Sequence, residues 1–364
     1  MSVKARSRIV YVVGAGLSAG LGFPTIGNLL SGIWPRLEAA GLADELADVI
    51  RFHHPAFNPA LHDTFPNIEE LLSEMQANSQ LFDSSRPATG SFTSQSLDER
   101  RQGLLLELAK WFHEIQAKAL SDPPVWLSQL AETIRTEKAQ VVSFNWDLVL
   151  DELLFGSTLS RENYAFSKSN KAPRLIKPHG SLNWYEESSG RHLKAAKKFR
   201  LCGSGTDKVY AFRLYRAPSS TRRRYMPFIV PPVYAKQFQG ELSKRLWQQT
   251  VSVLSKASEV RFLGYSLPVA DFHARFILRC GFHNQTAGEL REDGSRAHAT
   301  GQARVTVIDP NTDGPERIEA AVGWPCVHHA MKIEDWISSG ALRGPVRNSV
   351  CGAFIILPAL GKCL

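Results

Sequence analysis

The sequence predicts an α/β protein: a Rossmann-like parallel sheet with helices on both faces, and with an inserted helical subdomain. Three observations support this prediction. The strand-like segments are nearly continuous apolar runs, as expected of strands that are covered on both faces. A glycine-rich turn follows the first of them. About 125 residues with mostly helical patterning then separate the first strand from the second.

Six segments are predicted to be strands. They are short, apolar and rich in β-branched residues, which favours buried positions in a sheet. The segments are IVYVV (9–13), QVVSF (140–144), RLIKP (174–178), PFIVP (227–231), EVRFLGY (259–265) and RVTVID (304–309).

A helical subdomain is expected over residues 30–130. Its segments 66–76 and 99–120 carry apolar residues at three- and four-residue steps, the period of an amphipathic helix. A crossover between parallel strands does not need so many residues. We therefore expect one main domain over 1–335, with this helical insertion, a basic irregular insertion at 185–226, and a C-terminal tail at 336–364.

The composition is that of a globular protein, with 43% hydrophobic and 21% charged residues among 364. No apolar run approaches the roughly 18 residues that span a bilayer, so no membrane segment is expected. The five cysteines are scattered without a CxxC pair. This spacing predicts neither a disulfide framework nor a metal site, and it favours a reducing, cytoplasmic location.

The net charge of +8 is concentrated in one segment. Residues 191–224 contain eleven Lys or Arg and one acid, Asp207, so that this segment alone carries 11 − 1 = +10. Such a segment can contact nucleic acid or an acidic partner. It can equally be a solvated surface insertion, which is the commoner case.

The glycine turn GAGLSAG begins at Gly14, directly after the first strand. Gly14 and Gly16 permit a sharp turn and a close approach of the backbone to a ligand. A helix that starts here would direct N–H groups toward a phosphate, and the Ser18 hydroxyl could add a donor. The alternative is a purely structural strand-to-helix turn.

Polar residues follow the next two strands. Asn145 and Asp147 follow the second strand, and His179 follows the third. Ligands of parallel sheets bind beyond the carboxyl ends of the strands. Asn145 can hold a ribose hydroxyl or a water, Asp147 can cap the following helix, and His179 is either a general base or a structural histidine.

The last two predicted strands also end in polar residues. Gly264 and Ser266 end one of them, and Asp309 ends the other. Asp309 could hold two ribose hydroxyls, although Asp-Pro-Asn also favours a simple turn. Asp271 is expected to be an N-cap, and His273 on the same helix is expected to pack in the interior.

Taken together and in this order, these segments resemble the sirtuin superfamily. The segments are GAGLSAGLGFP, SFNWD, KPHGSLNW, GYSLPVADFHARFIL and VIDPN, which span residues 9 to about 313. The resemblance implies a fold that binds NAD⁺ as a substrate without reducing it. It implies catalytic roles for Asn145 and His179, and NAD⁺ contacts from Gly14, Ala15, Gly16, Ser18, Pro24, Thr25, Asp147, Gly264, Ser266, Asp309 and Asn311.

The sequence also departs from the deacylase members of that superfamily. It lacks their four-cysteine zinc module, and Thr25-Ile26-Gly27 replaces the Asp-Phe-Arg that follows their glycine loop. It is more similar to the bacterial sirtuin-like NAD⁺ hydrolases of anti-phage defence. That similarity implies cleavage of NAD⁺ to nicotinamide and ADP-ribose. A deacylase and a non-catalytic NAD⁺ or ADP-ribose sensor are the alternatives.

A toxic NAD⁺-depleting activity needs control. We expect control by a homo-oligomer or by a regulatory partner, such as a defence-system ATPase or a nucleic-acid sensor. The 191–224 segment and the apolar C-terminal tail are the expected contact regions.

Overall fold

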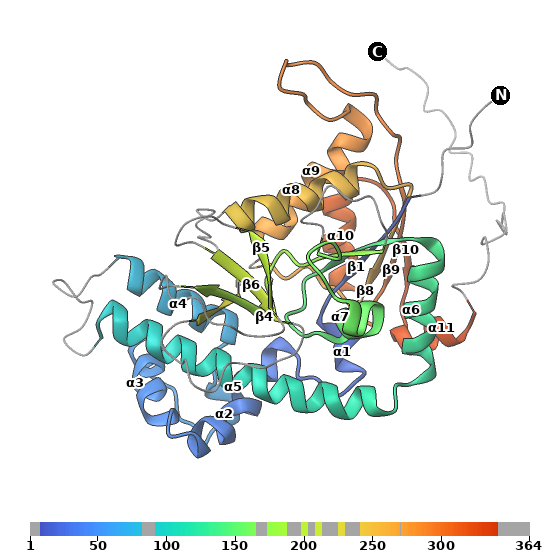
Figure 1. Ribbon diagram of the computed structural model, residues 1–364. Coiled ribbons are helices and arrows are strands. Elements are labelled where there is room, and N and C mark those ends of the chain that lie inside the picture. The colour runs from blue at the N-terminus through green and yellow to red at the C-terminus, as the bar shows by residue number, and fades with distance from the viewer. Residues whose placement is uncertain are drawn as a thin grey trace, which may run out of the picture.

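The computed structural model describes residues 8–81, 92–164, 173–187, 198–202, 208–212, 225–229, 241–269 and 271–340. These residues form a six-stranded sheet, a four-stranded sheet and a group of helices at one end of the molecule (Figure 1). Short 3₁₀ helices span Ile26–Asn28, His62–Thr64 and Gly156–Thr158.

The six-stranded sheet is parallel throughout and has the order β10-β9-β8-β1-β2-β3. Four strands are buried along nearly their whole length, as their continuous apolar runs predict. The predicted α/β class is thereby confirmed. The strands are β1 (Ile9–Val13), β2 (Gln140–Ser143), β3 (Arg174–Ile176), β8 (Glu259–Leu263), β9 (Arg304–Ile308) and β10 (Val327–His329).

Helices cover both faces of this sheet (Figure 1). From β1 the chain adds β2 and β3 on one side, and later β8, β9 and β10 on the other. Because crossovers between parallel strands are right-handed, this reversal puts their helices on opposite faces. One group is α6 (Val125–Glu137), α7 (Val149–Phe155) and α11 (Ile333–Ser338), and the other is α8 (Glu241–Ser255), α9 (Phe272–Ala287) and α10 (Asp313–Val322).

The helical insertion has a hydrophobic cluster of its own, which includes Ile33, Leu72 and Leu105. Its helices are α2 (Leu29–Ala39), α3 (Ala43–His53), α4 (Ile68–Leu81) and α5 (Ser94–Ser121). The expected boundary at residue 130 falls inside α6. Leu130 and Ile134 of this helix pack in the core of the main sheet, whereas Leu127 packs in the cluster of the helical unit, so α6 joins the two.

The four-stranded antiparallel sheet, of order β5-β6-β4-β7, corrects one prediction. The segment 227–231, predicted to join the parallel sheet, overlaps β7, which pairs antiparallel with β4. An apolar run indicates a buried strand but does not say which strand is its partner. The strands are β4 (Gly180–Glu187), β5 (Lys198–Cys202), β6 (Lys208–Phe212) and β7 (Tyr225–Ile229).

Two other expected segments are only partly described. The 185–226 segment, expected to be irregular, contains β5, β6 and parts of β4 and β7, so its described residues are regular. The rest of its basic residues, and the tail from 341 onward, lie outside the described residues.

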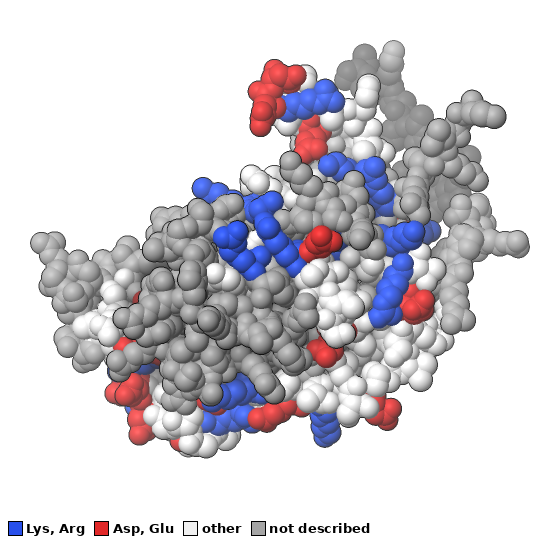
Figure 2. All heavy atoms as spheres, viewed as in Figure 1, with Lys and Arg blue, Asp and Glu red and all other residues white. Residues whose placement is uncertain are grey.

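Lys and Arg side chains gather over α8, which carries Lys244 and Arg245 (Figure 2). No helix in the described part of the chain is long and apolar enough to cross a membrane.

Candidate functional site

The candidate site lies at the carboxyl ends of the central strands of the parallel sheet. The order of the strands reverses between β1 and β8, and ligands of open parallel sheets bind at such a reversal. The short helix α1 (Ala15–Ala19) follows β1 here. Residues after β2, β3, β8 and β9 reach the same end of the sheet, because parallel strands all end on one side.

The glycine turn packs tightly against the turn after β8. The Gly14 N–H donates to the Leu263 carbonyl (3.1 Å), and the Gly16 N–H donates to the Gly264 carbonyl (2.9 Å). A Cβ at Gly16 would lie 2.7 Å from the Gly264 Cα, so no side chain fits there. The N–H groups of these two glycines are therefore used within the fold.

Ser18, Asn145 and Asp147 form a buried hydrogen-bonded cluster. The Ser18 hydroxyl donates to Asp147 Oδ2 (2.6 Å). Asn145 Nδ2 donates to the Ser18 Oγ (3.0 Å) and to the Gly14 carbonyl (2.9 Å). The cluster ties the loop after β2 to the glycine turn after β1. Two segments that the sequence analysis singled out separately are thus brought into direct contact.

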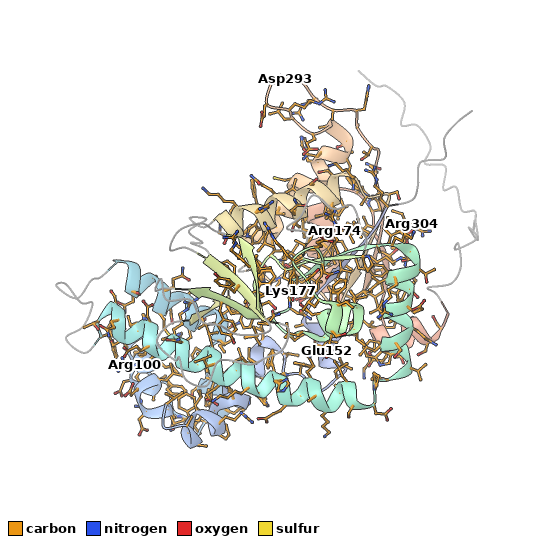
Figure 3. All side chains as sticks on the ribbon, in the orientation of Figure 1. Arg100, Glu152, Arg174, Lys177, Asp293 and Arg304 are labelled. Atoms are coloured by element: carbon orange, nitrogen blue, oxygen red, sulfur yellow. The ribbon has the colours of Figure 1, made fainter. Side chains whose placement is uncertain are left out.

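Asp147 has two further hydrogen-bond partners, Val149 and Lys177. Its Oδ1 accepts from the Val149 N–H (3.0 Å) two residues further on, whereas the N-cap residue of α7 is Leu148, so Asp147 supports the start of the helix from one residue before the cap. The fully buried Lys177 donates to the Asp147 carbonyl (2.6 Å) and lies in the middle of the molecule near α7 (Figure 3). Burial raises the pKa of the Asp147 carboxyl, while the Lys177 charge and the Ser18 hydrogen bond oppose that rise.

A small cavity of about 60 Å³ opens beside this cluster. Part of its wall comes from the helical insertion, including Glu69 of α4, which is buried to 7% exposure. The sequence analysis missed Glu69, because a glutamate in the first turn of a helix is common and has no distinctive signal. The lining residues include Ala15, Ser18, Pro24, Glu69, Asn145, Trp146 and Asp147.

His179 follows β3 and lies in a nearly closed aromatic environment at 3% exposure. Its Nε2 is 3.0 Å from Oδ2 of Asp271, the residue before α9. The edge of its ring meets Phe144 at 4.9 Å between centroids, and Phe144 in turn stacks on Tyr265. Asp271 also caps α9, as predicted, by accepting from the Ala274 N–H (3.1 Å). His273 is buried beside Trp247, in agreement with the expected packing role.

Three of the remaining predicted residues are Ser266, Asp309 and Thr25, none of which lines the cavity. Ser266 is exposed, and its carbonyl accepts from Arg317 of α10. The Asp309 carboxylate accepts from the Asn311 N–H (2.9 Å), which is the turn interaction that its sequence also favours. Thr25 is exposed at the start of the first 3₁₀ helix, and the residues that line the cavity do not include it.

Metal ligands were not predicted for this chain. Within the ranges that the structure describes, no three His, Cys, Asp or Glu side chains are grouped so that they could hold a metal ion.

The fold and the site define a parallel α/β protein with a polar, buried site at the reversal of strand order. No family model matches the sequence, and none of the curated proteins matches it.

Among solved structures, the chain is similar to several Sir2 proteins. One is a Sir2 in complex with an inhibitor, 2′-O-acetyl-ADP-ribose and a deacetylated peptide (12% identity, 92% of this chain and 94% of that chain, TM-score 0.41). Another is a mutant Sir2 homologue in complex with ADP-ribose (12% identity, 92% of this chain and 92% of that chain, TM-score 0.44). A third is a mutant Sir2 homologue in complex with 2′-O-acetyl-ADP-ribose (12% identity, 93% of this chain and 94% of that chain, TM-score 0.46).

Proposed function

We propose that this protein is an NAD⁺ glycohydrolase, which cleaves the nicotinamide–ribose bond to give nicotinamide and ADP-ribose. The observation that carries the proposal is the buried Ser18–Asn145–Asp147 cluster at the glycine turn, with its small cavity. His179 follows the neighbouring strand and supplies a titratable group at the same end of the sheet. The sequence motifs that resemble sirtuins contribute every one of these residues.

In this proposal NAD⁺ lies across the strand ends, with its pyrophosphate near the glycine turn. The backbone N–H groups of Gly14 and Gly16 already have partners, and the Ser18 hydroxyl already donates to Asp147, so Ala15 is the candidate contact and Ser18 acts by holding the turn. The cavity between the turn and the helical insertion takes the nicotinamide ring. Ser266, Asp309 and Asn311 remain the proposed contacts for the adenosine half.

The chemistry requires only water as a second reactant. The C1′–N bond breaks, its electron pair stays on nicotinamide, and positive charge develops on the ribose as in glycoside hydrolysis. Nicotinamide leaves as a neutral molecule, so no acid needs to protonate it. Water adds to C1′ and loses one proton, which His179 accepts. Asn145 Oδ1 accepts a hydrogen bond from the water or from a ribose hydroxyl, while its Nδ2 is held by the fold.

Hydrolysis is favoured over deacylation by two features of the sequence. The cysteines have no paired spacing of the kind that a four-cysteine zinc module requires. Thr25-Ile26-Gly27 occupies the place of the deacylase Asp-Phe-Arg. We therefore propose that water, rather than an acyl-lysine, attacks the ribose.

We further propose that the activity depletes NAD⁺ in anti-phage defence and is controlled by a partner or by oligomerisation. This rests on the similarity to bacterial NAD⁺ hydrolases and on the cost of an uncontrolled NAD⁺ hydrolase to the cell. The test removes the C-terminal tail and replaces with Ser the Lys and Arg residues of 191–224 that lie outside β5 and β6, because Leu201, Val209 and Ala211 of these strands pack in the main core. These changes should alter the assembly state or its regulation, as measured by sedimentation and NAD⁺ turnover. If both stay the same, this idea is wrong.

The proposed activity is tested by measuring nicotinamide and ADP-ribose release from NAD⁺ by the purified full chain. Asn145→Ala and His179→Ala should each lower turnover by about 10²–10⁴-fold, the usual contribution of a positioned general base. Arg304→Gln is the control, because Arg304 is half-exposed at the amino end of β9, away from the site (Figure 3). It should turn over NAD⁺ at the wild-type rate.

The alternatives give different results in the same assay. Release of nicotinamide only in the presence of an acetyl-lysine peptide would identify a deacylase. Binding of NAD⁺ in a calorimetric titration without any release would leave a sensor or an enzyme that lacks its activating partner, and the absence of both binding and release would contradict the proposal. Circular dichroism of each variant shows whether a loss of activity is a loss of fold.

A further inference from the structure

We propose that Asp271 is a positioning residue that fixes the orientation and the tautomer of His179. This inference rests on the proposed hydrolase function, but its main evidence is geometric. The two side chains come from different parts of the fold, β3 and α9, and meet with Asp271 Oδ2 3.0 Å from His179 Nε2. Asp271 is completely buried and His179 nearly so.

The surroundings of Asp271 indicate that it is an ionised acceptor. Its Oδ1 accepts from the Ala274 N–H (3.1 Å) and its Oδ2 accepts from the Tyr265 hydroxyl (3.3 Å). Burial raises the pKa of Tyr265 well above its ordinary value, so this hydroxyl keeps its proton and remains a donor. A carboxylate that receives donors on both oxygens is stabilised in its charged form.

An ionised carboxylate can only accept hydrogen bonds, so the proton on this side must belong to His179 Nε2. In the neutral imidazole the other nitrogen, Nδ1, then carries the lone pair. Nδ1 is therefore the atom that accepts the proton in the proposed reaction. When it does so, the charge of Asp271 stabilises the resulting imidazolium, as carboxylates do for catalytic histidines elsewhere.

The aromatic residues around the pair strengthen its interaction. Phe144 meets the His179 ring at 4.9 Å between centroids, and Phe144 stacks on Tyr265 at 4.3 Å with 5° between the planes. The ring of Trp247, which belongs to α8, lies 6.1 Å from the His179 ring between centroids. These rings pack around the His179–Asp271 hydrogen bond, and a charge-assisted hydrogen bond is stronger in such apolar surroundings than in bulk solvent.

Asp271 therefore combines two roles, and a single substitution separates them. Serine is also a favoured N-cap residue, so Asp271→Ser keeps an acceptor for the Ala274 N–H. Its side chain is shorter and uncharged, and it does not reach Nε2. Asp271→Asn keeps the size and the cap but replaces the carboxylate with an amide. Thr93→Ala, which removes the cap of α5 far from His179, reports on the loss of a helix cap alone.

The experiment records ¹⁵N spectra of the full chain labelled at histidine, with the His179 signals assigned from His179→Gln. The wild-type protein should hold the neutral ring with its proton on Nε2. Asp271→Ser should shift the ring toward a mixture of tautomers and lower kcat for NAD⁺ by about 10²–10⁴-fold, with little change in KM. Thr93→Ala should leave the His179 signals unchanged.

Two results would overturn the inference: a wild-type proton on Nδ1, or the same tautomer distribution in wild-type protein and Asp271→Ser. The spectra do not depend on turnover. If the tautomer responds as expected but the wild-type protein does not cleave NAD⁺, the positioning role stands and the proposed function fails.

Discussion

The roles of individual residues here depend on which groups the fold places around them. Lys177 is the clearest case, because its side chain is fully buried yet charged. Its ammonium group donates to Asp151 (3.2 Å), to the Ser181 hydroxyl (2.7 Å) and to the Asp147 carbonyl. A buried charge is tolerated only when it is paired and hydrogen-bonded in this way. Lys177 thus supports the loop that carries Asp147.

Lys177→Met should destabilise the protein by about 3–5 kcal/mol, because it leaves the Asp151 carboxylate buried without its cation. Lys110→Met is the matched control, since Lys110 pairs with Glu107 on the half-exposed surface of α5. Its loss should cost about 0–1 kcal/mol. The free energy of unfolding from urea denaturation measures both. Equal costs for the two variants would show that the buried pair contributes no more than a surface pair.

At the scale of elements, the site is held together by two turns in direct backbone contact. The turn after β1 and the turn after β8 are joined by the hydrogen bond from Gly16 to Gly264, and each leaves no room for a side chain on the other. Gly264 also has a φ of +58°, a conformation that favours glycine. The glycines are therefore required for the close contact between the two turns, independently of any ligand that binds there.

Gly16→Ala should destabilise the fold by about 1–3 kcal/mol, because the new Cβ would force the two backbones apart. The same shift should weaken NAD⁺ binding if the site is as proposed. Gly27→Ala provides the comparison, since a Cβ at Gly27 would meet nothing within 4 Å. That control should stay within about 0.5 kcal/mol of the wild type. Urea denaturation and NAD⁺ titration would contradict the prediction if both variants behaved alike.

On the scale of the whole molecule, the helical unit and the parallel sheet are joined through shared packing. Trp146 and Val149, which follow β2, are buried in the cluster of the helical unit. Trp126 and Leu153 pack against both clusters. The cavity lies at this junction, with walls from both parts. The helical unit is therefore part of the site and is expected to fold together with the sheet.

Leu72→Ala, deep in the helical unit, should lower the stability of the whole chain by about 2–5 kcal/mol. Because the clusters share residues, a single cooperative transition should shift as one unit. Far-ultraviolet circular dichroism and tryptophan fluorescence should give coincident midpoints in urea. Two separate transitions, with only the first shifted by the substitution, would mean that the units unfold independently.

The sequence by itself determined the class of fold and proposed most of the residues of the candidate site. Continuous apolar runs predicted five of the six parallel strands, because strands covered on both faces have no polar face to alternate with. It also singled out Ser18, Asn145 and His179, since polar residues near the carboxyl ends of parallel strands lie where such sheets bind ligands. The short edge strand β10, three residues long and partly exposed, carries no such signal.

Only the tertiary structure decided which of these residues have which partners. The pairing of Asp271 with His179, the placement of Glu69 at the cavity and the antiparallel pairing of β7 all join segments distant in sequence. Local patterns report burial and capping, which depend on neighbouring residues along the chain. Long-range pairing depends on how the whole chain packs. In this molecule it gave Asp271, which the sequence identified only as a helix cap, a second partner in His179.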